Sequence, residues 1–394
     1  MMQTQVAIIG AGPAGLLLSH MLRLAGISSV VLERGNRDHV GTRMRAGGLE
    51  HGAVALLEKV GLGQRLKDIG LIVEQTDFRF DGQGHRVDFA AMTQRCFTIY
   101  PQYEIVADLL QAHAKAGQEI LFDTPVTRIT GVESAQPHVY FLKDGEEQVL
   151  SCDFIAGCDG YHGPCKAAIP AGVLKVYEEN YPFAWLGILA EVAPPSLDVA
   201  YSCHERGFAM SSFRAPEVSR LYLQCPLEDK ADNWSDDRVW SELHTRMDVP
   251  DRPPLVEGQI TQKSVTAMKN FVIEPMQYGQ MFMAGDAAHI VPPTGAKGLN
   301  SALADISILA PAFSAFYQRG DRAPLDRYSQ TALKRVWQVQ RFSADMCTLL
   351  HRFPNTSEFN WRAQKERLRY MTTNPTGALT YAENFVGLPF EETA

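Results

Sequence analysis

The first third of the chain opens with three short segments whose apolar residues follow distinct spacings. Gln5 to Ile9 is a mainly apolar run typical of a buried strand, and Ser29 to Leu32 is a second, β-branched run. Between them, apolar residues recur at helical spacing from Leu16 to Leu24, and Gly26 follows where such a helix would end. This order predicts a strand, a helix and a second strand, the βαβ unit of a parallel sheet.

The middle of the chain alternates polar and apolar residues, as half-buried strands do. Between Val73 and Phe89 the alternation continues on both sides of the turn Asp81-Gly82-Gln83-Gly84, which predicts a hairpin. From Tyr181 to Lys263, strand-like segments follow one another. We expect these segments to form a mostly antiparallel sheet.

Helical spacing returns in three later segments. Apolar residues line one side of residues 103–116, and a long amphipathic helix begins at Leu299. Pro311 is expected to kink or end that helix, because proline lacks the backbone N–H group. A further helix is predicted from Leu325 to Leu350.

Composition narrows the class of protein. The 394 residues are 45% hydrophobic and 21% charged, enough for two or three domains with a large core. The net charge of −8 argues against a sequence-independent nucleic-acid partner. No uninterrupted apolar stretch is long enough to span a bilayer, and the N-terminal segment has no Lys or Arg before Arg23, unlike a signal peptide. The seven cysteines are scattered without a CxxC pair, which favours reduced thiols in the cytoplasm and predicts no metal site.

The turn after the first strand carries a GxGxxG motif formed by Gly10, Gly12 and Gly15. Glycines at these places let the backbone approach a pyrophosphate at a helix N-terminus. Glu33 ends the second strand, eighteen residues after Gly15, where an acid can accept a ribose hydroxyl. A glycine-rich turn alone is often a packing feature, but the complete context predicts a dinucleotide site.

Two further motifs follow predicted strands: Asp159-Gly160, and Gly285-Asp286 in the run GDAAH. Each alone is compatible with an ordinary turn. Together with the glycine motif, and in this order, they resemble the aromatic flavoprotein monooxygenases (group A), in which all three motifs meet around FAD. The resemblance implies FAD as the resident cofactor.

The resemblance becomes more specific over the whole chain. The segment PPTGAKGLN (292–300), a polar set on two predicted strands and the C-terminal segment AENFVGLP (382–389) are similar to the 4-hydroxybenzoate hydroxylase branch of that family. This branch uses NAD(P)H and O2 to hydroxylate its aromatic acid to 3,4-dihydroxybenzoate through a flavin C4a-hydroperoxide. The resemblance therefore implies a small aromatic acid as substrate and a homodimer as the assembly.

The resemblance also implies an α/β fold. We expect a FAD-binding Rossmann-like domain of the glutathione-reductase type, an inserted, mostly antiparallel β-sheet substrate domain, and C-terminal helices. Residues 1–72, 98–180 and 268–345 are assigned to the FAD-binding domain. Residues 73–97 and 181–267 are assigned to the substrate domain, and 346–394 to a C-terminal helical segment at an interface.

Family positions matched in this sequence suggest individual roles. Arg214 would bind the substrate carboxylate as a bidentate fork while hydroxyl groups add hydrogen bonds. Tyr201 would hold the para hydroxyl of the ring and favour its phenolate. An arginine on a strand is more often a solvated surface group, and a tyrosine there is more often packing. The implied catalytic residues are Tyr201, Pro293, Lys297 and Phe385, and the implied substrate-binding residues are Ser212, Arg214, Arg220, Tyr222 and Thr294. The implied FAD-binding residues are Gly10, Gly12, Gly15, Glu33, Arg43, Arg45, Gln102, Asp159, Asp286, Gly298, Leu299 and Asn300.

The sequence departs from the family in the proton relay from the para hydroxyl. Phe385 stands where the family has a second tyrosine, and the stretch 70–74 lacks the expected histidine. Gly48 replaces a bulkier apolar residue beside the ring, and we expect it to leave space. These changes predict a wider pocket that accepts 3,4-dihydroxybenzoate or 4-aminobenzoate.

NADPH is the expected reductant. Arg34 and Arg37 lie in the short segment that chooses between NADPH and NADH, and both can pair with a 2′-phosphate. His162 and Lys269 occupy further positions for the nucleotide, the latter as lysine where the family has arginine. An FAD-dependent oxidase or dehydrogenase, or a non-catalytic flavin redox sensor, would share the nucleotide fold but leave the segment 292–300 and Arg214 unexplained.

Overall fold

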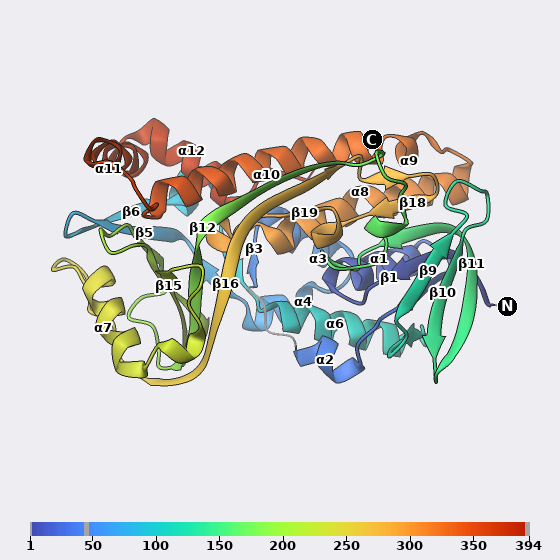
Figure 1. The fold of residues 1–394 in the computed structure, drawn as a ribbon, viewed down its shortest axis with the longest axis horizontal. Helices are drawn as coiled ribbons and strands as arrows, with labels where there is room; N and C mark the ends of the chain where they lie inside the picture. The colour runs from blue at the N-terminus through green and yellow to red at the C-terminus, as the bar shows by residue number, and fades with distance from the viewer. Residues whose placement is uncertain (1, 43–46, 391–394) are drawn as a thin grey trace.

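The computed structural model describes residues 2–42 and 47–390 (Figure 1). Two large sheets occupy opposite halves of an elongated molecule, and the long helix α10 (Tyr328–Leu350) extends along both. The predicted α/β class is confirmed.

The first sheet has a parallel centre. Its central strands run in the order β18-β11-β1-β2-β8, and every neighbouring pair among them is parallel. This confirms the predicted βαβ unit, because β1 and β2 flank the helix α1. The strands are β1 (Met2–Ile9), β2 (Ser29–Leu32), β8 (Ile120–Leu121), β11 (Glu146–Gly157) and β18 (Met281–Met283), with β9 (Val126–Thr130), β10 (His138–Lys143) and β17 (Gln277–Tyr278) added as antiparallel strands.

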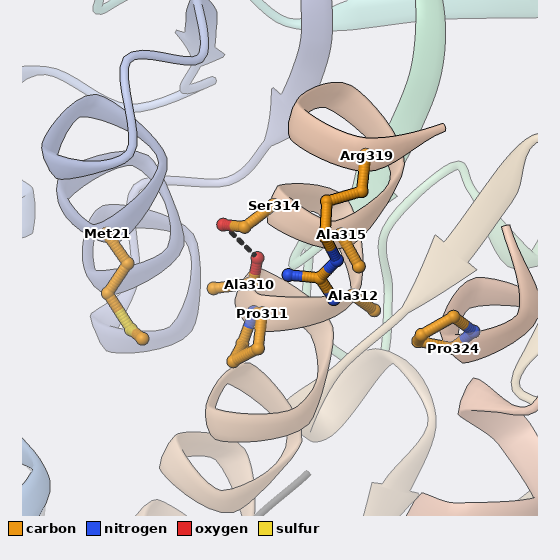
Figure 2. A pocket seen from close by; sticks show the side chains of 8 residues that line it. All are labelled: Met21, Ala310, Pro311, Ala312, Ser314, Ala315, Arg319 and Pro324. Carbon is orange, nitrogen blue, oxygen red and sulfur yellow. Dashed lines mark hydrogen bonds between the residues drawn. The ribbon is translucent and has the colours of Figure 1, made fainter. Parts of the chain in front are cut away.

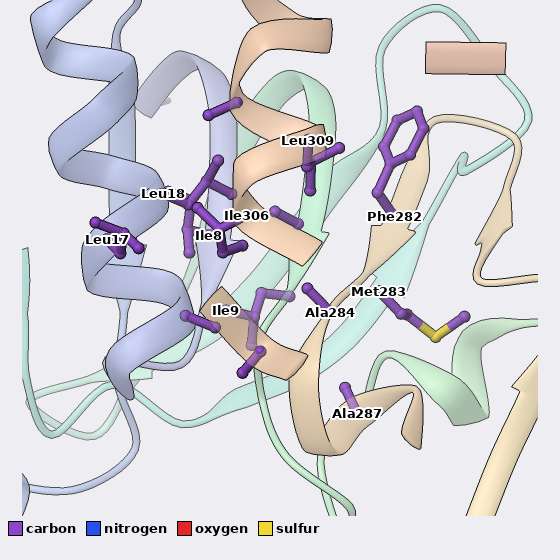
Figure 3. Close-up of a cluster of buried hydrophobic side chains, with 14 of the residues drawn as sticks. Ile8, Ile9, Leu17, Leu18, Phe282, Met283, Ala284, Ala287, Ile306 and Leu309 are labelled. Carbon is purple, nitrogen blue, oxygen red and sulfur yellow. The ribbon is translucent and has the colours of Figure 1, made fainter. Parts of the chain in front are cut away.

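The apolar core of this half lies between the sheet and two helices, α1 (Pro13–Leu24) and α8 (Gly298–Arg319). Ile8, Leu17 and Leu309 are fully buried there, and Figure 3 shows their side chains converging between the two helices and the strands. The packing fixes the start of α1 and the start of α8 relative to the ends of the strands.

The second sheet is the predicted, mostly antiparallel one. Its order is β19-β16-β12-β15-β14-β13-β5-β6, and only β13 and β5 pair in parallel. The predicted hairpin is β5 and β6, with Asp81 and Gly82 in its turn at φ of 51° and 73°. The strands are β5 (Gln75–Phe80), β6 (Gln83–Asp88), β12 (Lys175–Glu191), β13 (Val199–Ser202), β14 (Ala209–Ala215), β15 (Val218–Cys225), β16 (Gln259–Glu274) and β19 (His289–Ile290).

Two strands, β12 and β16, cross the domain boundaries expected at 180/181 and 267/268. They pair with each other along most of their length, with a register shift between Asn180 and Ala184. The assignment of residues to domains stays a prediction.

The remaining elements are short strands and helices. A three-stranded sheet contains β3 (Gly48–Leu49), β7 (Phe97–Ile99) and β4 (Leu71–Val73). The helices are α2 (Arg37–Thr42), α3 (His51–Lys59), α4 (Gly63–Ile69), α5 (Phe89–Thr93), α6 (Gln102–Lys115), α7 (Asp236–Met247), α9 (Ala323–Asp326), α11 (Glu358–Thr373) and α12 (Pro375–Val386). The single helix predicted from Leu325 is therefore two, since α9 ends before α10 begins.

Helix α8 corrects two expectations. It continues through Pro311 to Arg319, so the proline does not end the helix, because packing along the helix outweighs the loss of one backbone hydrogen bond; a kink at Pro311 stays a prediction. It is also long and apolar enough, by length and composition, to cross a membrane, although two thirds of that stretch (67%) is buried inside the protein. Its side chains pack on α1 and α10, as in a core helix.

Candidate active site

The predicted nucleotide motifs meet at one edge of the parallel sheet. Four strands of this sheet end in register, at Ile9, Leu32, Gly157 and Met283. The residues that follow these strands therefore lie together at the carboxyl edge of the sheet. In parallel α/β sheets this edge is the usual place for a ligand. The sequence motifs, which are far apart along the chain, therefore form one candidate site.

The glycine motif has the shape that a pyrophosphate needs. A Cβ on Gly15 would lie 2.0 Å from the Gly10 carbonyl oxygen, and Gly10 itself has φ of +102°. A Cβ on Gly12 would meet no atom within 4 Å, and no side chain caps the N-terminus of α1. The space beside Gly12 at the N-terminus of α1 is therefore open, which fits an anionic group held by the helix N-terminus.

The acids of the three motifs differ in their surroundings. Glu33 already accepts hydrogen bonds from the backbone N–H groups of Ala11 and Gly35, both at 2.8 Å. One oxygen of Asp159 accepts from the Cys165 N–H at 2.8 Å, and the other is buried without a hydrogen-bond partner. Burial raises the pKa of Asp159. An unsatisfied buried oxygen at this edge fits a hydroxyl donor of a bound nucleotide.

Asp286 is exposed at the same edge, in the turn after β18. Asp305 of α8 holds that turn, since its Oδ2 accepts from the Gly285 N–H at 2.8 Å and contacts His289 Nε2 at 2.7 Å. The sequence did not single out Asp305, because nothing local marks a buried helix residue as the support of a distant turn.

The N-terminus of α8 also lacks a side-chain cap. Lys297 precedes it, and a Cβ on Gly298 would meet no atom within 4 Å. The Asn300 side chain donates to the Gly48 and Ala296 carbonyls and accepts from the Glu50 N–H at 2.9 Å. Gly298 and Leu299 are partly exposed beside it. This end of α8 therefore fits a flavin, as the resemblance implied.

Two predicted contacts of FAD, Arg43 and Arg45, lie outside the described residues. Gln102 begins α6. A Cβ on Gly47 would lie 2.7 Å from the Gln102 nitrogen. The chain at Gly47 therefore packs closely on the backbone at the start of α6.

The polar set of the predicted ring pocket lies on β14 and β15. Ser212 and Arg220 are paired across the two strands, and Arg220 Nε donates to the Tyr222 hydroxyl. Arg214 is 7% exposed, and burial, with a smaller effect of Arg220, lowers its pKa. A buried guanidinium beside a second one favours an anionic guest.

Tyr103 on α6 is a contact of Arg214 that the sequence did not reveal. The guanidinium carbon lies 4.9 Å from the Tyr103 ring centroid, a cation–π arrangement. Helical spacing predicted α6 but could not show which strand it faces.

Tyr201 lies at the buried end of this region. Its side chain is 1% exposed, and its hydroxyl donates to the Thr294 carbonyl at 2.8 Å. Pro293, one residue earlier, is exposed in the turn before α8. Burial raises the pKa of Tyr201, which keeps this phenol neutral. The structure thus brings Tyr201 and Thr294 together beside the start of α8.

Phe385 is buried among aromatic rings. Its ring centroid lies 4.9 Å from that of Phe97 and 5.3 Å from that of Tyr381. The space expected at Gly48 is absent, because a Cβ there would lie 2.5 Å from the Phe97 ring. Phe97 has filled the gap, and this part of the widened-pocket argument was wrong.

An aromatic wall that the sequence analysis missed stands behind Tyr222. Trp185 of β12 packs on Tyr222, with 4.7 Å between the ring centroids. Its Nε1 donates a hydrogen bond to His351 Nε2 at 2.6 Å. His351 is fully buried and stacks on Phe208 at 4.5 Å. A buried histidine within a helical pattern looks like core, and only packing shows that it fixes the orientation of this indole.

The residues predicted for the reductant lie on three segments of the chain. Lys269 and Lys166 place their ammonium groups 3.7 Å and 4.2 Å from the Tyr161 ring centroid, and the His162 ring lies edge-on to the same ring. Arg34 and Arg37 are exposed after β2. The first group forms a small basic cluster around Tyr161.

A pocket of about 340 Å³ lies along α8. Figure 2 shows the side chains that line it. Its lining includes Met21, Pro311 and Arg319 but none of the predicted site residues. This pocket contributes nothing to the candidate active site.

Comparison with known proteins agrees with this geometry. A model of the FAD binding domain family matches residues 3–343. The chain belongs to this family, and within it to the flavin-dependent aromatic monooxygenases. It uses FAD together with NAD(P)H and O2.

One relative is similar to this chain over almost the whole of its length. The chain is 46% identical to the p-hydroxybenzoate hydroxylase of Acinetobacter baylyi over 391 residues, which cover 99% of this chain and 96% of the relative. In fold it is similar to the crystal structure of p-nitrophenol 4-monooxygenase from Pseudomonas putida, with a TM-score of 0.81, 18% identity, and coverage of 98% and 99% of the two chains. The complex of aklavinone-11 hydroxylase with FAD and aklavinone has a TM-score of 0.75 and 18% identity, over 89% of this chain and 70% of that one.

Proposed function

We propose that this enzyme hydroxylates 4-hydroxybenzoate to 3,4-dihydroxybenzoate. The observation that carries the proposal is Arg214, a buried guanidinium beside Arg220 on the same sheet as Tyr201. The relative from Acinetobacter, named for p-hydroxybenzoate, supports the same substrate. FAD, when bound, would supply the redox chemistry: two electrons from NAD(P)H and one O2 put one oxygen atom on the ring and release the other as water.

The residues of the chain orient the acid and shield it from water. Arg214 binds the carboxylate in a fork, and the hydroxyls of Ser212 and Tyr222 donate to it. Tyr201 then exchanges its bond to the Thr294 carbonyl for one to the para oxygen of the ring. It donates a hydrogen bond that favours the phenolate form, and water accepts the proton that the ring hydroxyl loses. Trp185 and Phe385 exclude water, so the reacting positions lie in a medium of low dielectric constant.

Glycine and acid positions at the sheet edge are proposed to hold FAD. Gly10, Gly12 and Gly15 cradle the pyrophosphate, Glu33 binds the adenosine ribose, and Asp286 binds the ribityl chain. Asp159 adds its unsatisfied oxygen, while Gly298, Leu299 and Asn300 contact the isoalloxazine. Arg43, Arg45 and Gln102 are proposed to complete the site.

The decisive experiment measures NAD(P)H oxidation with and without 4-hydroxybenzoate, identifies the product by chromatography, and compares Arg214 variants. We expect Arg214→Ala to weaken binding of the acid by roughly 100-fold and Arg214→Lys by roughly tenfold, since lysine keeps the charge without the fork. Arg128→Ala, on the outer strand β9, is the control for losing one exposed guanidinium. Unchanged affinity of the Arg214→Ala enzyme would overturn the proposal.

Phe385 favours a second candidate, wider specificity. No hydroxyl is available at this position to pass on the phenolic proton, so rings that depend less on deprotonation become alternatives. Turnover of 3,4-dihydroxybenzoate and 4-aminobenzoate would support this candidate. Product formation from 4-hydroxybenzoate alone would exclude it.

NADPH is proposed as the preferred reductant, with His162 and Lys269 at its pyrophosphate and Arg34 and Arg37 at its 2′-phosphate. The double change Arg34→Gln with Arg37→Gln should raise KM for NADPH roughly tenfold and leave KM for NADH nearly unchanged. Equal effects on both nucleotides would contradict the assignment. A cytoplasmic homodimer is also proposed, and light scattering of the purified protein measures the assembly.

A further inference from the structure

Four distant segments meet in a buried ionic cluster beside the start of α8. Lys297 Nζ donates to Glu50 Oε1 at 2.5 Å and to the Phe385 carbonyl at 2.9 Å. Arg335 of α10 donates to Glu50 Oε2 and, at 2.8 Å, to the Leu388 carbonyl. The cluster formed by Glu50, Lys297 and Arg335 therefore joins α3, α8, α10 and the C-terminal segment.

The cluster is almost completely removed from water. The side chains of Glu50 and Lys297 are 1% and 2% exposed, and that of Arg335 is 11% exposed. Gly387 has φ of +92°, and a Cβ there would lie 2.2 Å from Glu50 Oε2, so glycine is needed for the C-terminal segment to pass this carboxylate. Close packing on all sides fixes the distances between the charges.

Two cations share one carboxylate here. A single ion pair of Glu50 with Lys297 would carry no net charge, whereas the cluster with Arg335 carries one net positive charge. An uncompensated charge at a buried place is unfavourable unless an anion approaches. Lys297 immediately precedes the uncapped N-terminus of α8, whose dipole also favours an anion.

We propose that Arg335 is a positioning residue that prevents Glu50 from neutralising Lys297, so that the cluster presents one positive charge to the flavin end of α8. This inference rests on the proposed function, because it requires FAD to lie at Gly298 to Asn300. Arg335 acts through Glu50 and touches neither FAD nor substrate. The charge favours the flavin in its reduced, anionic form.

The test is the midpoint potential of bound FAD in a charge cycle. Burial lowers the pKa of Lys297 and Glu50 opposes this effect, so the potential is measured over a range of pH that keeps Lys297 protonated. In that range Arg335→Gln lowers the cluster charge from +1 to 0, Glu50→Gln raises it to +2, and the double variant restores +1. We expect the potential to become more negative in the Arg335→Gln protein, more positive in the Glu50→Gln protein, and close to the wild-type value in the double variant. Arg335→Lys keeps the charge and is the matched control, with a potential near that of the wild type.

A purely structural role gives a different pattern. It would move the potential in the same direction in both single variants, or equally in Arg335→Gln and Arg335→Lys, and either outcome overturns the inference. If the Arg335→Gln protein fails to fold, comparing the Glu50→Gln protein with the double variant measures the effect of the same charge. The absence of a negative shift in the potential between these two proteins would overturn the inference. Loss of FAD binding or of acid-stimulated NAD(P)H oxidation by the wild-type enzyme would instead overturn the proposed function.

Discussion

His351 illustrates what burial does to a single titratable side chain. It is fully buried and accepts a hydrogen bond from Trp185, so Nδ1 carries the hydrogen and donates to the Cys347 carbonyl at 2.9 Å. Burial lowers its pKa to about 3 from 6.5. The imidazole is therefore neutral in the folded protein over the whole physiological range.

This shift predicts a pH dependence of stability. Below pH 6.5 the unfolded chain binds a proton at this histidine while the folded protein does not, so the stabilisation is complete above pH 6.5 and is lost as the pH falls toward 3. Between pH 7 and pH 5 this histidine should contribute a loss of about 2 kcal/mol in the free energy of unfolding. Urea unfolding at pH 7 and pH 5 measures the difference in the free energy of unfolding between the two pH values. In the His351→Gln protein this difference should be smaller by that contribution. His162→Gln, at an exposed histidine, is the control, and an unchanged difference in the His351→Gln protein would contradict the prediction.

At the scale of elements, the turn from β1 to α1 contains two glycines, Gly12 and Gly15, that are needed for different reasons. Gly15 is needed by the fold, since a methyl group would collide with the Gly10 carbonyl, while Gly12 faces open space. The backbone at Gly12 has φ of −73°, which alanine adopts without strain.

Alanine at these two positions should therefore have opposite effects. Gly12→Ala should leave thermal unfolding of the apoprotein unchanged and weaken FAD binding at least tenfold, because the methyl group occupies the pyrophosphate space. Gly15→Ala should destabilise the apoprotein by about 2 kcal/mol or more, because overpacking shifts the backbone. Calorimetry of the apoproteins and FAD fluorescence titration measure both effects. A Gly12→Ala protein that binds FAD normally would place the pyrophosphate elsewhere.

At the scale of the whole molecule, the proposed FAD site joins distant segments between Gly10 and Asn300. Ligand binding to the folded state alone stabilises it by mass action, by about 2.7 kcal/mol at a FAD concentration 100 times Kd. For a chain of 394 residues, FAD should raise the Tm of the apoprotein by roughly 3 °C. FMN, which lacks the adenylate half, is the matched control and should give a smaller rise. Equal shifts from both flavins would contradict binding at the glycine motif.

The βαβ unit and the hairpin of β5 and β6 could be predicted because their signals are local. Glycine conformations, strand ends and helix starts depend on neighbouring residues, and these positions lie within about thirty residues of one another. Helix α7 and the break before α10 were missed, because the strand-rich pattern around α7 and the continuous helical spacing before α10 concealed both. Helix boundaries depend on tertiary packing as well as on spacing.

The sequence by itself determined the βαβ unit, the order of the nucleotide motifs and the family, since each is written in consecutive residues. Only the tertiary structure decided that Phe97 fills the space beside Gly48, that Asp305 supports the turn at Asp286, and that Arg335 shares Glu50 with Lys297. The physical reason is that packing volume and buried charge depend on which distant segments come into contact. No local pattern encodes such contacts, because each partner residue alone resembles ordinary core or surface.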